Sequence, residues 1–288
     1  YRFRSKDFDL RNKVDVINLF NKIKPNYVVH AAARLGGIGD NNNNPAHYYY
    51  DNIIMGINML KVASDFKIKK FINIGTVCSY PKFTPTPFDE KNLWDGLPEP
   101  TNSAYGLSKK SIIDYSYALH KQYNFTCINL LLANLYGIGD DFRQETSHVI
   151  PAIIKKIDYA IQNKKGEIIV WGDGSPTRDF LNVLDAASAI SKVLKSNYTK
   201  PDPINIATGK EVSINEIINV ISIKMGFKGK ITYDISKPNG QPVRVLNITK
   251  AKKFFDFEYS IGISEGIIDL IQYYKENKEG ILNMPKKY

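Results

Sequence analysis

A tyrosine and a lysine stand four residues apart in the stretch SAYGLSKK, at Tyr105 and Lys109. In a helix this spacing puts both side chains on one face, one turn apart. A lysine cation in that position stabilises a phenolate and lowers its pKa from about 10, so that a tyrosine can exchange protons near neutrality. Spacing alone does not identify such a site. Three other pairs have the same interval: Tyr117 and Lys121, Tyr233 and Lys237, and Tyr274 and Lys278.

The secondary structure around each pair must therefore show whether that pair belongs to a site. Near-continuous apolar runs predict parallel strands buried on both faces, at 27–33, 71–75 and 127–134. Amphipathic segments predict helices at 13–23, at about 45–66 and at about 103–122. Strands that alternate with helices in this way indicate a doubly wound parallel α/β sheet.

The carboxyl ends of these strands gather the candidate chemistry, because ligands bind at that edge of an open parallel sheet. HAAARLGG, GTVCSYP and ANLYG follow the first, second and third strands. The helix with Tyr105 lies between the second and third strands, so its first turn can face Thr76 and Cys78. The other three pairs lack that position. Tyr105, Lys109 and Thr76 can together protonate a ketone oxygen while a nicotinamide delivers hydride.

The second half of the chain predicts further α/β elements in a looser pattern. Helices are expected at about 148–162, 184–195, 213–225 and, last, about 263–277. Strands are expected at 203–208 and 230–234, and 167–183 is expected to run as strand, glycine turn and strand. The asparagine run at 41–44 predicts a loop and a helix cap.

Composition indicates a globular protein and excludes several other classes. The 288 residues are 43% hydrophobic and 24% charged, and no apolar run approaches the ~20 residues of a membrane span. The two cysteines, Cys78 and Cys127, predict a reducing cytoplasm and no disulfide framework. No metal site is expected. The net charge of +10 comes from scattered lysines, which favours a solvated surface suited to an anionic small molecule over nucleic acid.

Seven motifs resemble one known family. They are HAAARLGGIGDNNNNPAHYYYDN, GTVCSYP, YGLSK, ANLYG, SHVIPAI, WGDGSPTRDFLNV and SKPNGQP. In this order they resemble the extended short-chain dehydrogenase/reductases and, more narrowly, the GDP-L-fucose synthase family, from about Ser5 to the C-terminus. The resemblance implies a Rossmann-type NADP-binding domain over 1–138, with its sheet completed by about 178–208. It also implies a smaller, mainly GDP-sugar-binding α/β domain over 139–288.

The resemblance also implies NADPH as cofactor and three sets of site residues. The catalytic residues would be Tyr105, Lys109, Thr76 (where serine is more usual), Cys78 and His148. The cofactor contacts would be Asp9, Leu10, Ala32, Gly75, Thr76, Lys109, Leu132, Ala133, Asn134 and Leu135. The GDP-sugar contacts would be His148, Lys156, Trp171, Arg178 and Asn239, the last often aspartate in the family. Leu132 and Ala133 depart from the commoner motif PTNLYG.

Plainer roles are open for several of these residues. A cysteine in isolation is more often a small buried residue than a base. Trp171 and Arg178 can belong to an ordinary hairpin, and His148 can simply cap or pack against its helix. His30, inside a predicted buried strand, is expected to be structural.

The activity that the resemblance implies has two steps. Cys78 and His148 would exchange the protons at C3 and C5 of GDP-4-keto-6-deoxymannose, and Tyr105 with NADPH would reduce C4 to give GDP-L-fucose. A homodimer with a four-helix bundle from 45–66 and 103–122 is also implied. The alternatives are a nucleotide-sugar ketoreductase or epimerase without both steps, and a non-catalytic nucleotide-sugar-binding protein.

One family feature does not occur in these residues, namely the first strand and glycine-rich turn that bind the cofactor pyrophosphate. LGGIGD lacks the required glycine spacing and is expected to form a flexible loop over the site. We expect the natural chain to extend upstream by about one βα unit, and the sequence as written to bind dinucleotide poorly.

Overall fold

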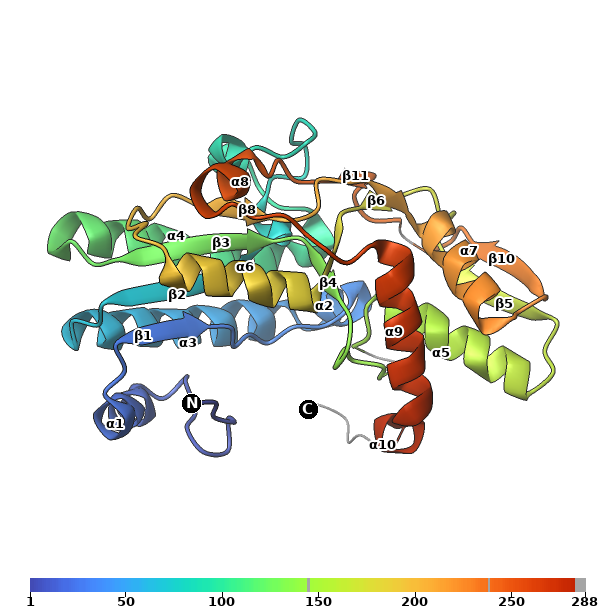
Figure 1. Cartoon of the computed structure of the whole chain (residues 1–288), viewed down its shortest axis with the longest axis horizontal. Helices are drawn as coiled ribbons and strands as arrows, with labels where there is room; N and C mark the ends of the chain where they lie inside the picture. Colours follow the sequence, from blue (N-terminus) through green and yellow to red (C-terminus); the bar gives the residue numbers. More distant parts are fainter. Residues whose placement is uncertain (144–145, 238, 283–288) are drawn as a thin grey trace.

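A parallel sheet forms the centre of the protein (Figure 1). In the computed structural model, which describes residues 1–143, 146–237 and 239–282, four strands stand in the order β1, β2, β3, β8. Their bounds are β1 Tyr27–His30, β2 Lys70–Thr76, β3 Cys127–Leu132 and β8 Ile204–Ile206. Every neighbouring pair is parallel. The predicted α/β sheet and its three first strands are confirmed.

Helices cover both faces of this sheet. On one face α3 (Pro45–Asp65) and α4 (Ser103–Tyr123) pack over Phe71 and Cys127, which are partners in register. On the other face α6 (Val183–Lys195) packs over Ile72, in the same core cluster as the strand residues beside it. Helix α1 (Lys13–Ile23) lies against α3. Alternate residues of β2 therefore serve two separate cores, as expected for a strand buried on both faces.

Strand β1 departs from that prediction. It stands at the end of the sheet and has one partner strand, β2, among the described residues. Tyr27 is 50% exposed and Val29 is 40% exposed, whereas His30 on the opposite face is buried. The prediction that 27–33 is buried on both faces is therefore wrong. Within the described residues, the face of β1 with His30 is packed and the face with Tyr27 and Val29 is exposed.

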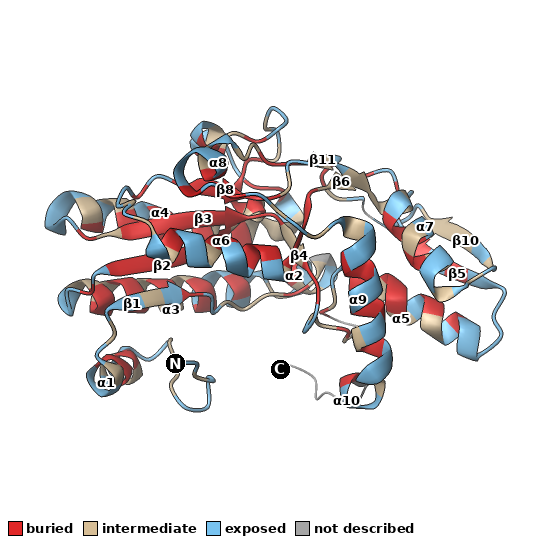
Figure 2. Ribbon diagram, viewed as in Figure 1, coloured by how far each residue is buried: buried red, intermediate tan, exposed pale blue. Residues whose placement is uncertain are grey.

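A second core lies beyond the carboxyl edge of the sheet, to the right in Figure 1. Helices α5 (Val149–Gln162), α7 (Ile214–Met225) and α9 (Ile263–Glu276) pack around the parallel strands β5 (Glu167–Trp171) and β10 (Lys230–Asp234). Figure 2 shows buried residues along the inner faces of α5 and α9 and along β2 and β3. The predicted helices and strands of the second half are present.

The segment 167–183 does not form a hairpin. Strand β5 pairs with β10, while β6 (Thr177–Arg178) pairs with β11 (Val243–Arg244) and with β9 (Val212–Ser213). Strand β7 (Phe180–Asn182) pairs with β4 (Asn134–Tyr136). The hairpin reading of Trp171 and Arg178 is therefore wrong, because their neighbours come from distant parts of the chain.

The asparagine run also differs from its prediction. It belongs to helix α2 (Ile38–Asn43), where the Asn41 side chain donates to the carbonyl oxygens of Gly36 and Gly37 at 2.7 and 3.1 Å. Asn44 precedes α3 without a side-chain capping bond. The remaining elements are the 3-10 turns η1 (Val77–Ser79), η2 (Glu90–Trp94) and η3 (Pro100–Asn102), α8 (Thr249–Phe255), and α10 (Lys278–Leu282), which follows the helix predicted to be last.

The carboxylate of Asp179 joins the two halves of the fold. It lies between β6 and β7, is fully buried, and accepts hydrogen bonds from Thr208 N at 2.9 Å and Thr208 Oγ1 at 2.7 Å. It also accepts from Gly209 N at 2.9 Å and Leu246 N at 3.4 Å. Burial raises the pKa of Asp179, although all these bonds favour the charged form. One side chain therefore fixes the end of β8 to the chain that leaves β11.

Removal of this carboxylate should strongly destabilise the protein. In Asp179→Ala several buried donors lose their acceptor, so we expect a loss of roughly 3 to 5 kcal/mol in unfolding free energy. Asp173→Ala is the matched control, because Asp173 is exposed in the same segment and its carboxylate accepts hydrogen bonds from Ser175 N and Oγ at 2.8 and 2.7 Å. It should leave the unfolding free energy nearly unchanged. Urea denaturation measures both variants, and equal losses would contradict the anchoring role.

Candidate active site

The turn after β2 meets the start of α4. Thr76 accepts a hydrogen bond at its Oγ1 from Cys78 N at 3.2 Å, and Ser79 Oγ donates to the Gly106 carbonyl at 3.1 Å. A Cβ on Gly106 would lie 2.3 Å from the Cys78 carbonyl oxygen, so only glycine permits this approach. The turn that carries Cys78 is thereby held directly against the helix that carries Tyr105.

Tyr105 and Lys109 are both buried at this junction, with 6% and 2% exposure. The Tyr105 hydroxyl hydrogen-bonds to the side chain of Thr76. Burial raises the pKa of Tyr105, the nearby Cys78 sulfur raises it further, and the bond to Thr76 opposes them. The predicted lowering of this pKa is therefore not found, because desolvation of the phenolate exceeds the opposing effects. Tyr105 is held as a protonated donor.

The three competing pairs lie elsewhere. Tyr233 hydrogen-bonds to Asn215 at 2.6 Å, and Tyr274 hydrogen-bonds to Asp158 at 3.0 Å, both in the second core. Burial raises the pKa of Tyr117, with Asp202 as the next cause. None of these hydroxyls is placed beside Thr76 and Cys78 in the part of the chain that the structure describes. The position of Tyr105 is what distinguishes it.

The expected cofactor contacts follow neighbouring strands of the main sheet. Ala32 comes just after β1, Gly75 lies in β2, and Leu132 ends β3 opposite Thr76 in register. The side chains of Leu132 and Ala133 belong to the core cluster. Asn134 and Leu135 continue into β4, where the Asn134 amide donates to the Asp179 carbonyl at 3.1 Å. These residues therefore gather along one edge of the sheet.

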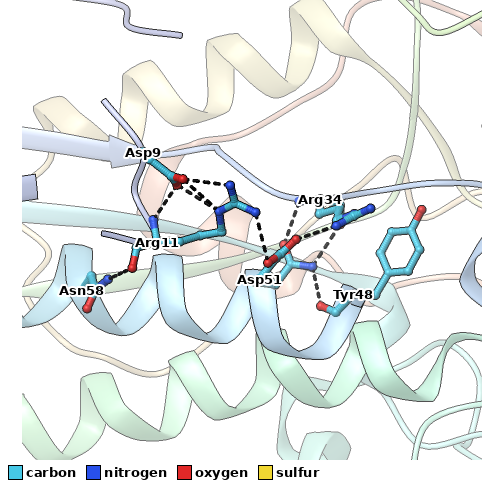
Figure 3. Close-up of polar contacts among 7 residues, drawn as sticks. Asp9, Arg11, Arg34, Tyr48, Asp51 and Asn58 are labelled. Atoms are coloured by element: carbon cyan, nitrogen blue, oxygen red, sulfur yellow. Dashed lines mark hydrogen bonds and ion pairs between the residues drawn. The ribbon is translucent and has the colours of Figure 1, made fainter. Parts of the chain in front are cut away.

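Helix α3 holds the rest of this edge in place. Asp51, which is 7% exposed, forms ion pairs with Arg34 at 2.7 Å and with Arg11 at 3.5 Å, and Arg11 also pairs with Asp9 at 2.8 Å (Figure 3). Arg11 lowers the pKa of Asp9 through the hydrogen bonds between their side chains. The charges link the segment around Asp9 and the loop after β1 to a single helix.

Two asparagines of α3 add hydrogen bonds to the same segments. Asn58 donates to the carbonyl oxygens of Leu10 and Arg11 at 3.1 and 3.0 Å. Asn52 accepts from Arg34 N at 2.8 Å and donates to the Arg34 carbonyl at 3.0 Å. One face of α3 therefore fixes the backbone on either side of β1. These bonds hold the residues that are expected to contact the cofactor in place relative to the sheet.

Two arginines face Cys78 from the three-stranded sheet of β11, β6 and β9, the small sheet. Arg178 and Arg244 are partners in register on β6 and β11, and Arg244 Nη1 donates to Cys78 Sγ at 3.5 Å. Burial, followed by the charge of Arg244, lowers the pKa of Arg178 to about 10, while Cys78 and Glu99 oppose this shift. Sequence reasoning named Arg178 and missed Arg244 and Glu99. The one available signal was that Arg244 stands two residues after the SKPNGQP motif.

The other predicted substrate contacts form a second group around the end of β5. Lys156 Nζ donates to the Ile169 carbonyl at 2.8 Å, and Trp171 is 57% exposed two residues further along the strand. Lys237 Nζ lies 5.7 Å from the centre of the Trp171 ring. Asn239 Oδ1 accepts from Asp173 N at 3.0 Å. An open aromatic face flanked by cations suits a flat, anionic ligand.

His148 stands apart from Cys78 at the start of α5. It is the N-cap residue but makes no side-chain capping bond, and its Nδ1 lies 3.9 Å from Asp140 Oδ1. A Cβ on Gly37 would lie 3.1 Å from the Ser147 carbonyl oxygen, so the loop after β1 closely approaches this turn. The structure brings Thr76, Cys78 and Tyr105 together. No hydrogen bond joins His148 to that group in the described residues.

Comparison with known proteins identifies the class. Residues 3–207 match the model of the NAD dependent epimerase/dehydratase family, and the chain belongs to this family. In none of the described residues is a helix both long and apolar enough to cross a membrane.

Relatives within this family narrow the identification and confirm the resemblance to GDP-L-fucose synthases. GDP-L-fucose synthase 1 of Arabidopsis thaliana is 35% identical over 94% of this chain and 83% of that protein. GDP-L-colitose synthase of Yersinia pseudotuberculosis is 36% identical over 95% and 89%. The crystal structure of a GDP-L-fucose synthetase from Naegleria fowleri bound to NADP superposes with a TM-score of 0.85 at 29% identity, over 96% of this chain and 85% of that one.

The pKa of Lys109 predicts a limit on pH. Burial lowers it to about 8, so the ammonium is present below that value and lost above it. We expect kcat/KM for ketone reduction to fall as the pH rises through about 8, because the neutral amine no longer stabilises the Tyr105 phenolate. Lys109→Arg is the control, since its guanidinium stays charged and should remove that limb. Rates from about pH 6 to about pH 10 test this, and a flat wild-type profile would refute it.

Proposed function

We propose that this chain is an NADP-dependent epimerase and reductase that converts GDP-4-keto-6-deoxymannose to GDP-L-fucose. The observation that carries the proposal is the placement of a cysteine against a Thr–Tyr pair at the carboxyl edge of the sheet. Cys78 stands two residues after Thr76 and donates its backbone N–H to the Thr76 hydroxyl, and Arg244, on the small sheet, donates to the Cys78 sulfur. The names of the relatives support the same activity.

Epimerisation uses the acidity that the C4 ketone gives to the neighbouring C–H bonds. The Cys78 thiolate takes the proton from C3 or C5, the C–H bond breaks, and the electron pair moves to the C4 oxygen as an enolate. A proton delivered to the opposite face of that carbon inverts it. We assign this delivery to His148, at the wall formed by the start of α5.

Reduction at C4 uses the Tyr105 group. NADPH, when bound, supplies the hydride. The Thr76 hydroxyl holds the ketone oxygen by a hydrogen bond, and Tyr105 donates its phenolic proton to that oxygen. Lys109 lies one turn further along α4 and stabilises the phenolate that remains. Because burial keeps Tyr105 protonated, the proton is available when the alkoxide forms.

The residues along this edge of the sheet fit NADPH at its nicotinamide end. Ala32, Gly75 and Leu132 follow or end neighbouring strands beside Tyr105, and the backbone of Leu10 is fixed by Asn58. We propose that these residues, with Asp9, Thr76, Lys109, Ala133, Asn134 and Leu135, hold the cofactor. The division into domains at residue 138 and the cytoplasmic location both stay predictions.

The GDP moiety would bind across the second core. Arg178 has a fork-shaped cation that suits the diphosphate, and its neighbour in register is a second arginine. Trp171 offers an exposed ring for stacking with guanine, and Lys156 and Asn239 lie around the same strand. The general positive charge of the protein, +10, would attract such an anion.

Exchange and reduction can be tested separately. Without NADPH and in deuterated water, Cys78→Ser and His148→Asn should each slow deuterium incorporation at C3 and C5 by ~10²-fold or more. Both should still reduce an already epimerised 4-ketosugar, because Tyr105 and Lys109 are intact. Tyr105→Phe should show the reverse, with exchange retained, reduction abolished and GDP-sugar binding nearly unchanged. Mass spectrometry and NMR follow exchange, and NADPH absorbance follows reduction.

The outcomes separate the alternatives. Reduction without any exchange by the wild type would leave a plain ketoreductase. Binding of the GDP-sugar with neither exchange nor NADPH oxidation would leave a non-catalytic binding protein. Exchange at the wild-type rate in one variant would remove that residue from the epimerisation chemistry.

We also propose a homodimer in which α3 and α4 pair with their copies. A Cβ on Gly56 would lie 2.3 Å from the Ile112 side chain, so these helices pack closely, and Tyr49 and Tyr50 stand exposed on α3. We expect a dimer by analytical ultracentrifugation at micromolar concentration. Tyr50→Lys should weaken it, and Phe83→Lys, at a loop residue that is 87% exposed, should not. A wild-type monomer would contradict the proposal.

A further inference from the structure

We propose that Arg244 is a positioning residue for Cys78, whose guanidinium holds the sulfur as a thiolate in the orientation that removes the C3 and C5 protons. The inference rests on the proposed function and adds a residue that the sequence did not indicate. It stands on the contact between Arg244 Nη1 and Cys78 Sγ, at 3.5 Å.

The guanidinium is rigidly held. Arg244 is 6% exposed, and its Nε donates to Gln241 Oε1 at 3.0 Å. Gln241 is itself 5% exposed, and its amide donates to the Lys82 carbonyl at 2.7 Å. The Arg244 carbonyl accepts from Asp179 N at 2.8 Å. Both the side chain and the backbone of Arg244 are therefore fixed, so the direction of its bond to Cys78 is set before substrate arrives.

The charge of Arg244 requires an anion. A buried cation is costly unless a negative group lies beside it. In the described residues the guanidinium hydrogen-bonds to Gln241, which is neutral, and to Cys78. Its neighbour in register, Arg178, has the same charge. Glu99, from the turn before α4, is the carboxylate that acts on Arg178. The Cys78 sulfur is thus the contacting group that can take a negative charge, and a cation beside a cysteine favours the thiolate.

This arrangement divides the work between the two arginines. When the thiolate takes the proton from C3 or C5, an S–H bond forms and a C–H bond breaks. The Arg244 contact holds the sulfur before that transfer and after the proton is given back. Arg178 is only partly buried and is available to the diphosphate. A change at Arg244 should therefore alter exchange, and a change at Arg178 should alter binding.

The experiment compares Arg244→Gln, Arg244→Lys and Arg178→Gln. Deuterium exchange at C3 and C5 of saturating GDP-4-keto-6-deoxymannose should fall ~10-fold or more in Arg244→Gln, with a smaller fall in Arg244→Lys. Reduction of an already epimerised 4-ketosugar should stay within about 2-fold. Added guanidinium ion should restore part of the exchange in Arg244→Gln. Arg178→Gln should instead raise KM for the GDP-sugar.

A second measurement does not depend on turnover. Alkylation of Cys78 by iodoacetamide at neutral pH, followed by peptide mass spectrometry, should be ~10-fold slower in Arg244→Gln and intermediate in Arg244→Lys, because the thiolate is the nucleophile. Cys127 is fully buried and is the internal control. Circular dichroism shows whether each variant is folded.

The inference is overturned if folded Arg244→Gln exchanges and alkylates at the wild-type rates. It is also overturned if exchange falls while alkylation and guanidinium rescue show no effect, since this would indicate a purely structural role. If the wild type neither exchanges nor oxidises NADPH, the proposed function fails. A slower alkylation in Arg244→Gln would still support the Arg244–Cys78 contact in that case.

Discussion

The buried carboxylate of Asp179 is the constraint on which the site depends. Its two oxygens accept from the backbone and hydroxyl of Thr208 and from the amides of Gly209 and Leu246. These donors follow β8 of the main sheet and β11 of the small sheet. A carboxylate buried without them would be prohibitively unstable, so its charge and their geometry require each other. The main sheet and the small sheet are thereby fixed in one arrangement.

The same residue positions groups of the proposed site on either side of it. Its backbone donates to the Arg244 carbonyl and accepts from Asn134, and Arg178 precedes it in the chain. Two arginines of one small sheet are therefore set against the Cys78 turn of the other sheet. Cys78 and Arg244 are more than 150 residues apart in the chain, and Asp179 helps to bring them together because it bonds both the Arg244 backbone and Asn134, which follows the strand beside β2.

Sequence patterns predicted the sheet and most helices because burial imposes period and composition on the chain. They placed Tyr105 beside Thr76 and Cys78 through the rule that strand ends meet at one edge. They failed for β1, because its apolar run does not reveal that Tyr27 and Val29 are exposed in the described residues. They also failed for β5 and β6, because pairing with β10 and β11 depends on residues some 60 positions away. Glu99 carries no local signal, and Arg244 carries none beyond its place two residues after SKPNGQP, since a lone charged residue is normally solvated. Their roles depend on tertiary contacts alone.

The two halves of the proposed chemistry need opposite behaviour from neighbouring groups. One group must give up a proton readily, and the other must keep its proton until an alkoxide forms. Cys78 and Tyr105 lie near each other, but the groups that surround them differ. Arg178 and Arg244 face the sulfur, whereas burial raises the pKa of Tyr105 and lowers that of Lys109. Pairs of titratable groups whose surroundings differ in this way can serve as base and acid in one site. In the proposed chemistry, the two arginines that face Cys78 and the burial of Tyr105 are therefore what would let both groups act on the same sugar.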